Sequence, residues 1–379
     1  MRKSRLAVAS FFLVNGLVYG NWTARLPEIQ SFFGISNQIL GSVLLVLAIG
    51  ALVSMPFTGW LNLRYSGHKI TLITGVGVCI MTPFLVSSSH LYFIVPVFFL
   101  FGLCNGAMDV AMNGQAVYVE RAYQRPIISS FHAMFSIGMA LGAGMSALIT
   151  KTGLSLQTHF IFLSGLSLVL ILFASGNLIK EEPDPHQSGN EPGFRWPTKA
   201  ILPLGLIAFC GMTGEGSMAD WSAIFITIIL KSSEFYGALA IGIFSAAMTV
   251  GRIFGDYFTA LLGKRLLLLT DTLLAIAGLS LLLFSGHLIT ALVGLGIMGL
   301  GLSTVVPIVY AMAGNTPGVK PSVGIAMATT IGYTGFFVGP PVIGFLSDSF
   351  NLKVGLGFSL FLFLSMFVII LYAFRPVKE

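Results

Sequence analysis

Residues 180–199, KEEPDPHQSGNEPGFRWPTK, interrupt an otherwise apolar chain with four acidic residues and four prolines. Apolar runs of about 20 residues lie on both sides, and an α-helix that rises 1.5 Å per residue needs about that length to cross a hydrocarbon core. Six such runs precede the segment and six follow it. The segment is therefore expected to be a cytoplasmic linker between an N-terminal bundle, residues 1–179, and a C-terminal bundle, residues 200–379.

The composition predicts an all-α integral membrane protein. Of the 379 residues, 55% are hydrophobic and 9% are charged, whereas a soluble globular chain has roughly 25% charged residues. These values exclude a soluble enzyme and a disordered chain, and three cysteines are too few for a disulfide scaffold. The twelve predicted spans cover residues 5–29, 37–61, 69–89, 92–117, 128–150, 157–179, 200–229, 234–258, 265–285, 288–313, 322–346 and 352–374.

Positive charge marks one side of the predicted membrane protein. Of the 20 Lys and Arg residues, 15 fall at the termini and in the alternate loops on the side of the linker, and such loops face the cytoplasm. We therefore expect an inner-membrane protein with both termini in the cytoplasm and an uncleaved first helix in place of a signal peptide. The net charge of +6 suits anionic lipid headgroups and requires no nucleic-acid partner.

The two halves resemble each other at a nearly constant offset. Gly41, Gly59 and Gly67 recur 196 residues later as Gly237, Gly255 and Gly263, and Gly138 and Gly142 recur 197 residues later as Gly335 and Gly339. Six spans separate the copies, so both copies have the same orientation in the membrane. This is a parallel repeat about an axis along the membrane normal. It predicts two pseudo-symmetric six-helix bundles, an arrangement that suits alternating access to a central site.

Residues 332–348, GYTGFFVGPPVIGFLSD, carry a distinctive glycine and proline pattern. The pattern resembles span eleven of the major facilitator superfamily (MFS). Residues 215–221, EGSMADW, and 248–252, MTVGR, resemble the YbjJ-type inner-membrane proteins near the fucose permease group. The resemblance covers nearly the whole chain and implies the MFS fold, transport, and action mainly as a monomer. One departure is Leu63, since the superfamily has at that place an acid that joins a charge network closing the cytoplasmic side.

Span four contains a stripe of polar residues. Asn105, Asp109 and Asn113 follow one another at intervals of four, which places them on one helical face. A charged side chain in the middle of a bilayer costs about 2.5 to 3.5 kcal/mol, so such a residue is a functional candidate. Asp109 is interpreted as a proton carrier or as a hydrogen-bonded contact between helices. The resemblance favours the first reading, because fucose-permease-like symporters also have an acid in span four.

Residues 211–217, GMTGEGS, have three glycines near the middle of span seven, which predicts a broken helix beside a cavity. Glu215 in this stretch is a candidate for solute or proton binding, or alternatively a structural partner of Arg252. The guanidinium of Arg252 in span eight needs an acid, which would be Asp256 on its own helix, or Glu215 or Asp109 across a cavity. Protonation of that acid would release the arginine and couple charge to conformation.

Further polar and aromatic side chains in the spans are predicted to bind the solute. With the two asparagines of span four, they are Asn15, Tyr19, Trp22, Asn105, Asn113, His132, Trp221, Tyr310 and Tyr333. Two of them have alternatives: His132 as a neutral histidine held by a neighbouring helix, and Trp221 as part of the interfacial aromatic belt. Arg25 is expected to pair with Glu28 or to extend its charge to the membrane surface.

These features favour a secondary transporter that uses protons to move a small, sugar-like polar solute. Two alternatives stay open. One is a proton-driven efflux antiporter for amphiphilic compounds, suggested by Met108, Met112, Met134 and Met139, and the other is a membrane sensor without transport. A membrane enzyme is not indicated, because the sequence shows neither a nucleophile with a base nor metal-ligand spacing. ATP is not expected as the energy source, because no phosphate-binding loop is present. No cofactor is expected, and the expected partners are the solute, protons and membrane lipid.

Overall fold

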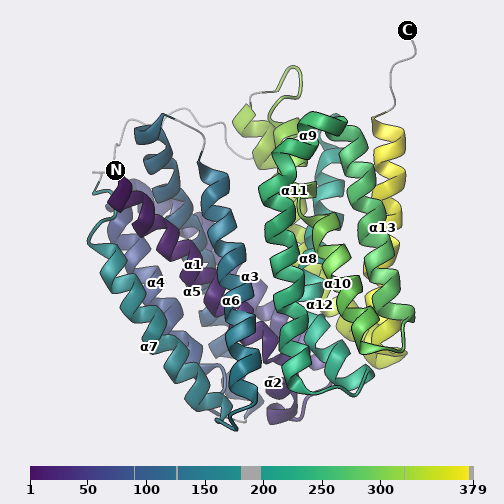
Figure 1. Cartoon of the computed structure of the whole chain (residues 1–379). Coiled ribbons are helices and arrows are strands. Elements are labelled where there is room, and N and C mark those ends of the chain that lie inside the picture. The colour runs from purple at the N-terminus through teal and green to yellow at the C-terminus, as the bar shows by residue number, and fades with distance from the viewer. Residues whose placement is uncertain (89, 125–126, 181–197, 320, 375–379) are drawn as a thin grey trace. The chain divides into compact units, whose positions relative to one another are not determined.

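A computed structural model describes residues 1–88, 90–124, 127–180, 198–319 and 321–374. For residues 59, 60, 62–64, 91, 129, 321–323 and 326 it describes the backbone alone. Every regular element in these ranges is helical (Figure 1). The predicted linker lies almost entirely outside the described residues, and so does the side chain of Leu63.

The helices follow the predicted spans closely. Before the linker the described chain forms α1 (Arg2–Ala24), α2 (Leu26–Phe33), α3 (Asn37–Arg64), α4 (Gly67–Phe84), α5 (Leu91–Tyr123), α6 (Ile128–Thr150) and α7 (Leu156–Ser175). After the linker it forms α8 (Leu202–Ile224) with a π-helical turn, η2 (Phe225–Ile229), then α9 (Glu234–Phe284), α10 (Leu288–Leu302), α11 (Val305–Ala313), α12 (Pro321–Ser349) and α13 (Leu352–Ala373).

Eight of the described helices are long and apolar enough to cross a membrane. One of these, α9, contains two spans, because Gly263 in its middle has φ 75° and ψ 157°. Glycine adopts this conformation without steric cost, so the chain turns there and starts a second helix. Together with α4, α8 and α12, which coincide with three further apolar runs, the described residues contain the twelve predicted segments.

The first span ends earlier than predicted. α1 stops at Ala24, Arg25 has φ −101° and ψ 8°, and the short helix α2 follows. Pro27 explains the interruption, because it has no N–H for the carbonyl of Thr23 and its ring crowds that carbonyl. The predicted span over residues 5–29 is therefore wrong at its end, and Glu28 lies outside the first membrane-spanning helix.

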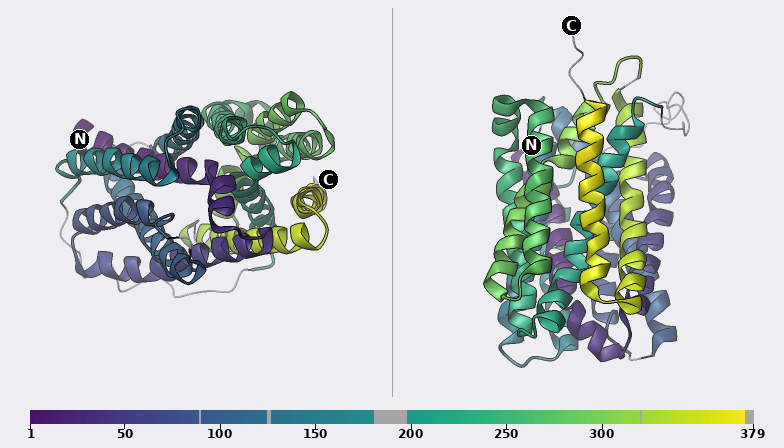
Figure 2. Two further views of the ribbon diagram at one scale, coloured as in Figure 1. Left: turned by 90° about the horizontal axis from the view of Figure 1, so that it is seen from below. Right: turned by 90° about the vertical axis from the view of Figure 1, so that its right-hand side faces the viewer.

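The described helices group into two compact units. The first contains α1–α7 together with Glu234–Gly242, the first turns of α9, which the division at the linker would place in the other half. The second contains α8, the remainder of α9 and α10–α13. Figure 2 shows the helices of each unit nearly end-on and from the side.

Glycines allow α1 and α6 of the first unit to pack with their backbones in contact. A Cβ atom on Gly20 would lie 2.7 Å from Cα of Met139, and one on Gly142 would lie 2.9 Å from the backbone nitrogen of Asn21. Real Cβ atoms essentially never come closer than 3.0 Å to such atoms, so an alanine would force the helices apart. Gly138 and Gly142 of α6 therefore serve the close approach of two membrane helices, as small residues do at such interfaces.

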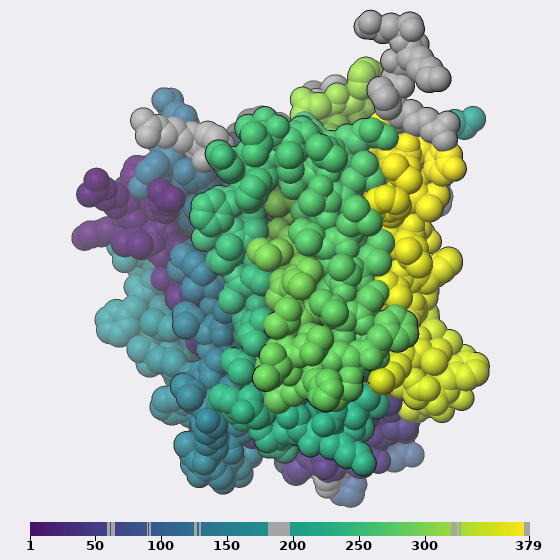
Figure 3. Space-filling model, turned by 45° about the vertical axis from the view of Figure 1, so that its right-hand side comes forward, coloured from purple at the N-terminus to yellow at the C-terminus, as the bar shows by residue number. Residues whose placement is uncertain are grey.

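Large apolar side chains cover the outside of the second unit. Phe284 of α9, Ile289 of α10 and Phe361 of α13 are 78%, 77% and 63% exposed. These helices form much of the face drawn in green and yellow in Figure 3. An apolar surface of this extent marks a region that is covered in the native environment, and lipid tails provide that cover for membrane-spanning helices.

α8 is a continuous helix, so the predicted break at the glycines of span seven is wrong. Gly214 packs directly against the ring of Phe363, and a Cβ on Gly216 would lie 2.8 Å from Cδ1 of Phe336. The glycines therefore serve close packing against α12 and α13. This packing offsets their low helix propensity of roughly 1 kcal/mol each.

An interruption lies instead in span ten, between α10 and α11, at Ser303 and Thr304. Pro307 accounts for it, since it cannot donate to the carbonyl of Ser303 four residues earlier and its ring crowds that carbonyl. Regular bonding resumes when the N–H of Ile308 donates to the carbonyl of Thr304 at 3.0 Å. Irregular backbone at membrane depth is tolerated where protein surrounds it, and both residues are buried.

Candidate functional site

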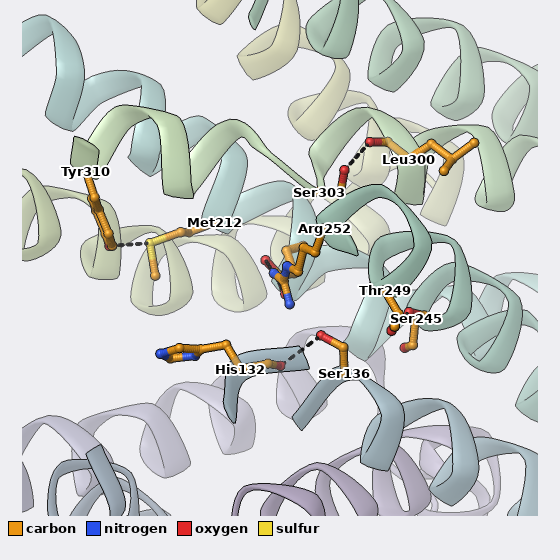
Figure 4. A network of polar contacts seen from close by, with 10 residues as sticks. His132, Ser136, Met212, Ser245, Thr249, Arg252, Leu300, Ser303 and Tyr310 are labelled. Carbon is orange, nitrogen blue, oxygen red and sulfur yellow. Dashed lines mark hydrogen bonds and ion pairs between the residues drawn. The ribbon is translucent and has the colours of Figure 1, made fainter. Parts of the chain in front are cut away.

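The second unit holds an ion pair between two of its membrane helices. Arg252 of α9 donates through Nη2 to both carboxylate oxygens of Glu215 in α8, at 3.3 Å and 3.4 Å. Each side chain is 20% exposed, so neither is sealed in the protein interior. Glu215 is thus the acid that pairs with Arg252, as one of the predicted alternatives states. Figure 4 shows Arg252 within this polar network.

Tyr310 of α11 lies beside this ion pair. Its hydroxyl donates to Sδ of Met212 at 3.7 Å and forms a hydrogen bond with Thr329. It also interacts electrostatically with the carboxylate of Glu215. Figure 4 shows the contact between Tyr310 and Met212. Helices α8, α9, α11 and α12 therefore each supply a polar group to one region of the second unit.

The two aromatic residues predicted in spans seven and eleven differ in accessibility. Tyr333 of α12 is partly exposed, and its ring lies 5.9 Å from that of Phe336. Trp221 of α8 is completely buried, and its Nε1 has no hydrogen-bond partner among the described residues. A side chain without exposed surface cannot stack on a solute in this conformation, nor lie in an interfacial belt. We therefore leave Trp221 out of the candidate site.

The predicted polar stripe in span four is present in the first unit. Nδ2 of Asn113 donates to Oδ1 of Asp109 at 3.2 Å and to its backbone carbonyl at 2.8 Å. Asn105, Asp109 and Asn113 are all partly exposed. The described residues show no basic side chain in an ion pair with Asp109, so an asparagine on the same helix is its hydrogen-bonding partner.

The residues predicted to bind the solute in span one also differ in accessibility. Asn15 is buried and donates through Nδ2 to Sδ of Met112 at 3.8 Å, while its Oδ1 has no partner among the described residues. Tyr19 is partly exposed and its ring stacks edge-on against Trp22. Trp22 itself is 1% exposed and packs between Phe98 and other rings of α5, so it also leaves the candidate site.

His132 of α6 is exposed, and its ring meets the ring of Phe12 edge-on at 5.3 Å. The hydroxyl of Ser136 donates to the backbone carbonyl of His132 at 3.3 Å, a bond that involves the main chain of His132. The predicted groups therefore form two sets. One set, in the first unit, contains Asp109 and His132, and the other, in the second unit, contains Glu215 and Arg252.

One acid in the spans was missed by the sequence reasoning. Asp271, in the second helical part of α9, is buried and accepts a hydrogen bond from the hydroxyl of Thr304 at the interruption of span ten. The available signal was a single carboxylate within the apolar run LLLLTDTLLAIAG at residues 266–278.

A second group of charges lies outside the membrane-spanning helices, at the start of α2. Arg25 and Glu28 form an ion pair, which confirms the predicted pairing. Burial and a hydrogen bond with Glu234 raise the pKa of Glu28 to about 8, while the charge of Arg25 opposes this rise. Close by, the ammonium of Lys151 lies 3.7 Å from the ring centre of Phe235. The contact of Glu28 with Glu234 and that of Lys151 with Phe235 both involve the first turn of α9. They help to explain why the start of α9 groups with the first unit.

The described residues contain no group of three or more His, Cys, Asp or Glu side chains that could hold a metal ion. The three cysteines, Cys79, Cys104 and Cys210, are free thiols. The chemistry that these sets offer is hydrogen bonding and proton exchange with a small molecule.

Comparisons with known proteins agree with this architecture. Residues 8–320 match the family model of the Major Facilitator Superfamily. The chain is 33% identical over 346 residues to an MFS-type transporter of Yersinia pestis, a match that covers 91% of this chain and 89% of that one. It is 30% identical over 382 residues to the transporter y4wD of Sinorhizobium fredii, which covers 98% and 97% of the two chains.

Among solved structures, the nucleoside transporter NupG superposes with a TM-score of 0.81 over 98% of this chain and 99% of its own. At 12% identity this likeness concerns the fold alone. It confirms the predicted all-α membrane fold of two six-helix bundles. The family match across most of the chain and the 33% identical relative lead to the same conclusion: the chain belongs to the Major Facilitator Superfamily, whose members are multi-span membrane carriers and not enzymes.

Proposed function

We propose that the chain is a secondary active transporter that moves a small polar solute by alternating access and is driven by the proton gradient. The ion pair between Glu215 and Arg252 is the observation that carries this proposal. Its N–O distances of 3.3 Å and 3.4 Å are longer than those of a strong charge-assisted bond, and a fifth of each side chain is exposed. A proton can therefore reach Glu215, and its arrival would release Arg252.

The coupling follows from the charges. Arginine keeps its proton at every physiological pH, so the pair has net charge zero when Glu215 is ionised and +1 when it is protonated. A positive charge that no carboxylate balances is unfavourable in a membrane interior. The protonated state therefore favours any conformation in which Arg252 gains another anion or water. This differential stability is what a transport cycle needs in order to couple proton binding to a change of conformation.

The accessible groups favour a neutral polar solute. Asn105 and Asn113 in the first unit, with Tyr310 and Tyr333 in the second, are partly exposed and offer amides, hydroxyls and ring faces. Such groups bind sugars and related polyhydroxylated molecules by hydrogen bonds and stacking. Because the solved neighbour NupG is a nucleoside transporter, nucleosides belong in the same test panel.

The alternative of an amphiphile exporter has less support. An apolar, methionine-rich binding surface requires accessible methionines. Met134 is partly exposed, whereas Met108, Met112 and Met139 are 0%, 1% and 5% exposed. Met112 also supplies its sulfur to Asn15. These side chains belong to the packed core of the first unit.

The proposal also includes an inner-membrane location with cytoplasmic termini, lipid as the surrounding medium, and a carrier that acts as a monomer.

The test is uptake into proteoliposomes with an imposed pH gradient, using labelled hexoses, polyols and nucleosides as probes. Glu215→Gln and Asp109→Asn are compared with wild type and with Asp348→Asn, an exposed acid at the end of α12. A coupling acid is identified by a variant that loses accumulation but still exchanges internal for external solute. Undiminished accumulation by both Glu215→Gln and Asp109→Asn would refute the proposed mechanism, and absence of uptake for the whole panel in wild type would refute the solute class.

A further inference from the structure

Asp271 is a carboxylate in an apolar setting with one neutral partner. It is 4% exposed and lies seven residues after Lys264, at which the second helical part of α9 begins. At 1.5 Å per residue this is about 10 Å into the span. Among the described residues the hydroxyl of Thr304 is its hydrogen-bonding partner, and no basic side chain forms an ion pair with it.

The partner of Asp271 lies at the interruption between α10 and α11. Thr304 is 6% exposed, and a Cβ on Gly255 of the first part of α9 would lie 2.8 Å from its methyl group. A Cβ on Gly301 would lie 2.5 Å from the backbone oxygen of Asp271. The two parts of α9 and the interrupted span therefore enclose the acid without space for a bulky ligand.

The internal repeat indicates that packing does not require an acid here. The offset of 196 residues that relates Gly67 to Gly263 places Gly75 at the position of Asp271. In the first unit this position is filled by neighbours, because a Cβ on Gly75 would lie 2.9 Å from the ring of Phe11. A glycine suffices in one copy, so the carboxylate in the other copy adds a chemical property to the same structural position.

From this geometry we propose that Asp271 is a proton-binding site, held by Thr304 at the interruption of span ten and separate from the pair of Glu215 and Arg252. An ionised carboxylate with no cation nearby is unfavourable at this depth, whereas a neutral acid is not. A sodium ion would need several oxygen ligands, and the described side chains around Asp271 supply two groups, its own carboxylate and one hydroxyl. A proton needs only the carboxylate.

The charged and titratable side chains on the surrounding elements are few. The first part of α9 carries Glu234, Tyr236, Arg252, Asp256 and Tyr257, the second part begins with Lys264 and Arg265, and α11 carries Tyr310. Arg252 pairs with Glu215, and Asp256 is exposed. α10 carries no charged residue. No described contact joins any of these groups to Asp271, so its protonation is governed by burial and by Thr304.

The step itself is a simple dissociation. The neutral acid releases one proton to water and becomes a carboxylate, and no bond other than O–H breaks. The hydroxyl of Thr304 donates to the carboxyl group in both states, since the carbonyl oxygen of the acid and the carboxylate oxygen are both acceptors. Deprotonation leaves a buried anion and therefore favours any rearrangement that admits water or a cation to the interrupted helix.

The proposal can be tested by infrared difference spectroscopy on the purified protein in lipid vesicles while the buffer pH is stepped upward. The probe is the C=O stretch of a protonated carboxylic acid. Wild type and the control Asp348→Asn should share a band that disappears as pH rises, and Asp271→Asn should lack this band while it keeps those of other acids such as Glu28. The asparagine keeps an oxygen that accepts from Thr304, so this variant preserves the packing contact and removes only the titration.

A second variant keeps the proposal testable if Asp271→Asn does not fold. Thr304→Val keeps the volume of the side chain but removes the hydroxyl, so the band should persist at a shifted frequency. An unchanged band in both variants, or a wild-type spectrum without a titrating acid at Asp271, would overturn the proposal. This readout does not depend on solute. A titrating Asp271 in a carrier that proves independent of protons would leave the site intact and refute only the proposed function.

Discussion

The pair of Glu215 and Arg252 allows a structural role to be separated from a coupling role by a double-mutant cycle. The variants are Glu215→Gln, Arg252→Met and the double variant. At 3.3 Å the attraction between two unit charges is about 1 kcal/mol in water and about 5 kcal/mol at an effective dielectric constant of 20. Because each side chain is 20% exposed, screening reduces the larger figure, and we expect a coupling free energy of about 2 kcal/mol.

Each single variant should therefore lose about 2 kcal/mol of unfolding free energy, because it leaves one charge without its partner. The double variant should lose about the same amount and not the sum, since it removes both charges together. The measurement is equilibrium unfolding in detergent, monitored by circular dichroism. Additive losses would show that the two side chains do not interact and would refute the geometry of the pair.

The same three variants distinguish the roles when transport is measured. If the pair only holds α8 against α9, the double variant should be no less stable than either single variant and should still accumulate solute. If Glu215 couples protons to transport, the double variant should have the same stability while accumulation stays absent and exchange persists. Full accumulation by the double variant would refute the coupling role.

Three further predictions use other parts of the molecule. Gly142→Ala should be less stable than Gly144→Ala by about 1 to 3 kcal/mol in detergent unfolding, since both gain helix propensity but only the first meets backbone of α1; equal stability would contradict the close packing. Burial raises the pKa of Glu28, so this group favours folding at acidic pH and that contribution is lost as pH rises from about 4.5 to about 8; thermal melts of Glu28→Gln should show a weaker decline over this range. Asp109→Asn should still exchange solute but lose its accumulation by a pH gradient, as measured in vesicles with an ionophore control.

The fold could be predicted because it depends on apolar length. Runs of about 20 residues became helices almost residue for residue, as residues 128–150 and α6 illustrate. The irregular points depend on tertiary contacts and were harder. The glycines around Glu215 predicted a break, but Phe336 and Phe363 fill the space beside them and the helix continues. Pro307 was the one sequence signal of the break in span ten. A proline disrupts the helical turn that precedes it, so this local effect could have been predicted from the sequence.

The candidate site was predicted in part. Helical spacing placed Asp109 and Asn113 together, and the need of Arg252 for an acid pointed to Glu215. Accessibility was not predictable, because a tryptophan in a span packs into a core or lines a path depending on neighbours far away in sequence. Trp221 is buried for this reason. Asp271 escaped notice because its partner lies 33 residues later, across an interruption that apolar patterning does not reveal.

The backbone contact between α1 and α6 limits the routes by which a molecule can reach the interior of the first unit. A compound dissolved among the acyl chains would have to pass laterally between two neighbouring helices to reach this interior. At Gly20 and Gly142 the main chains touch, and even one methyl group finds no room. Lateral entry between α1 and α6 is thus blocked along the length of this contact.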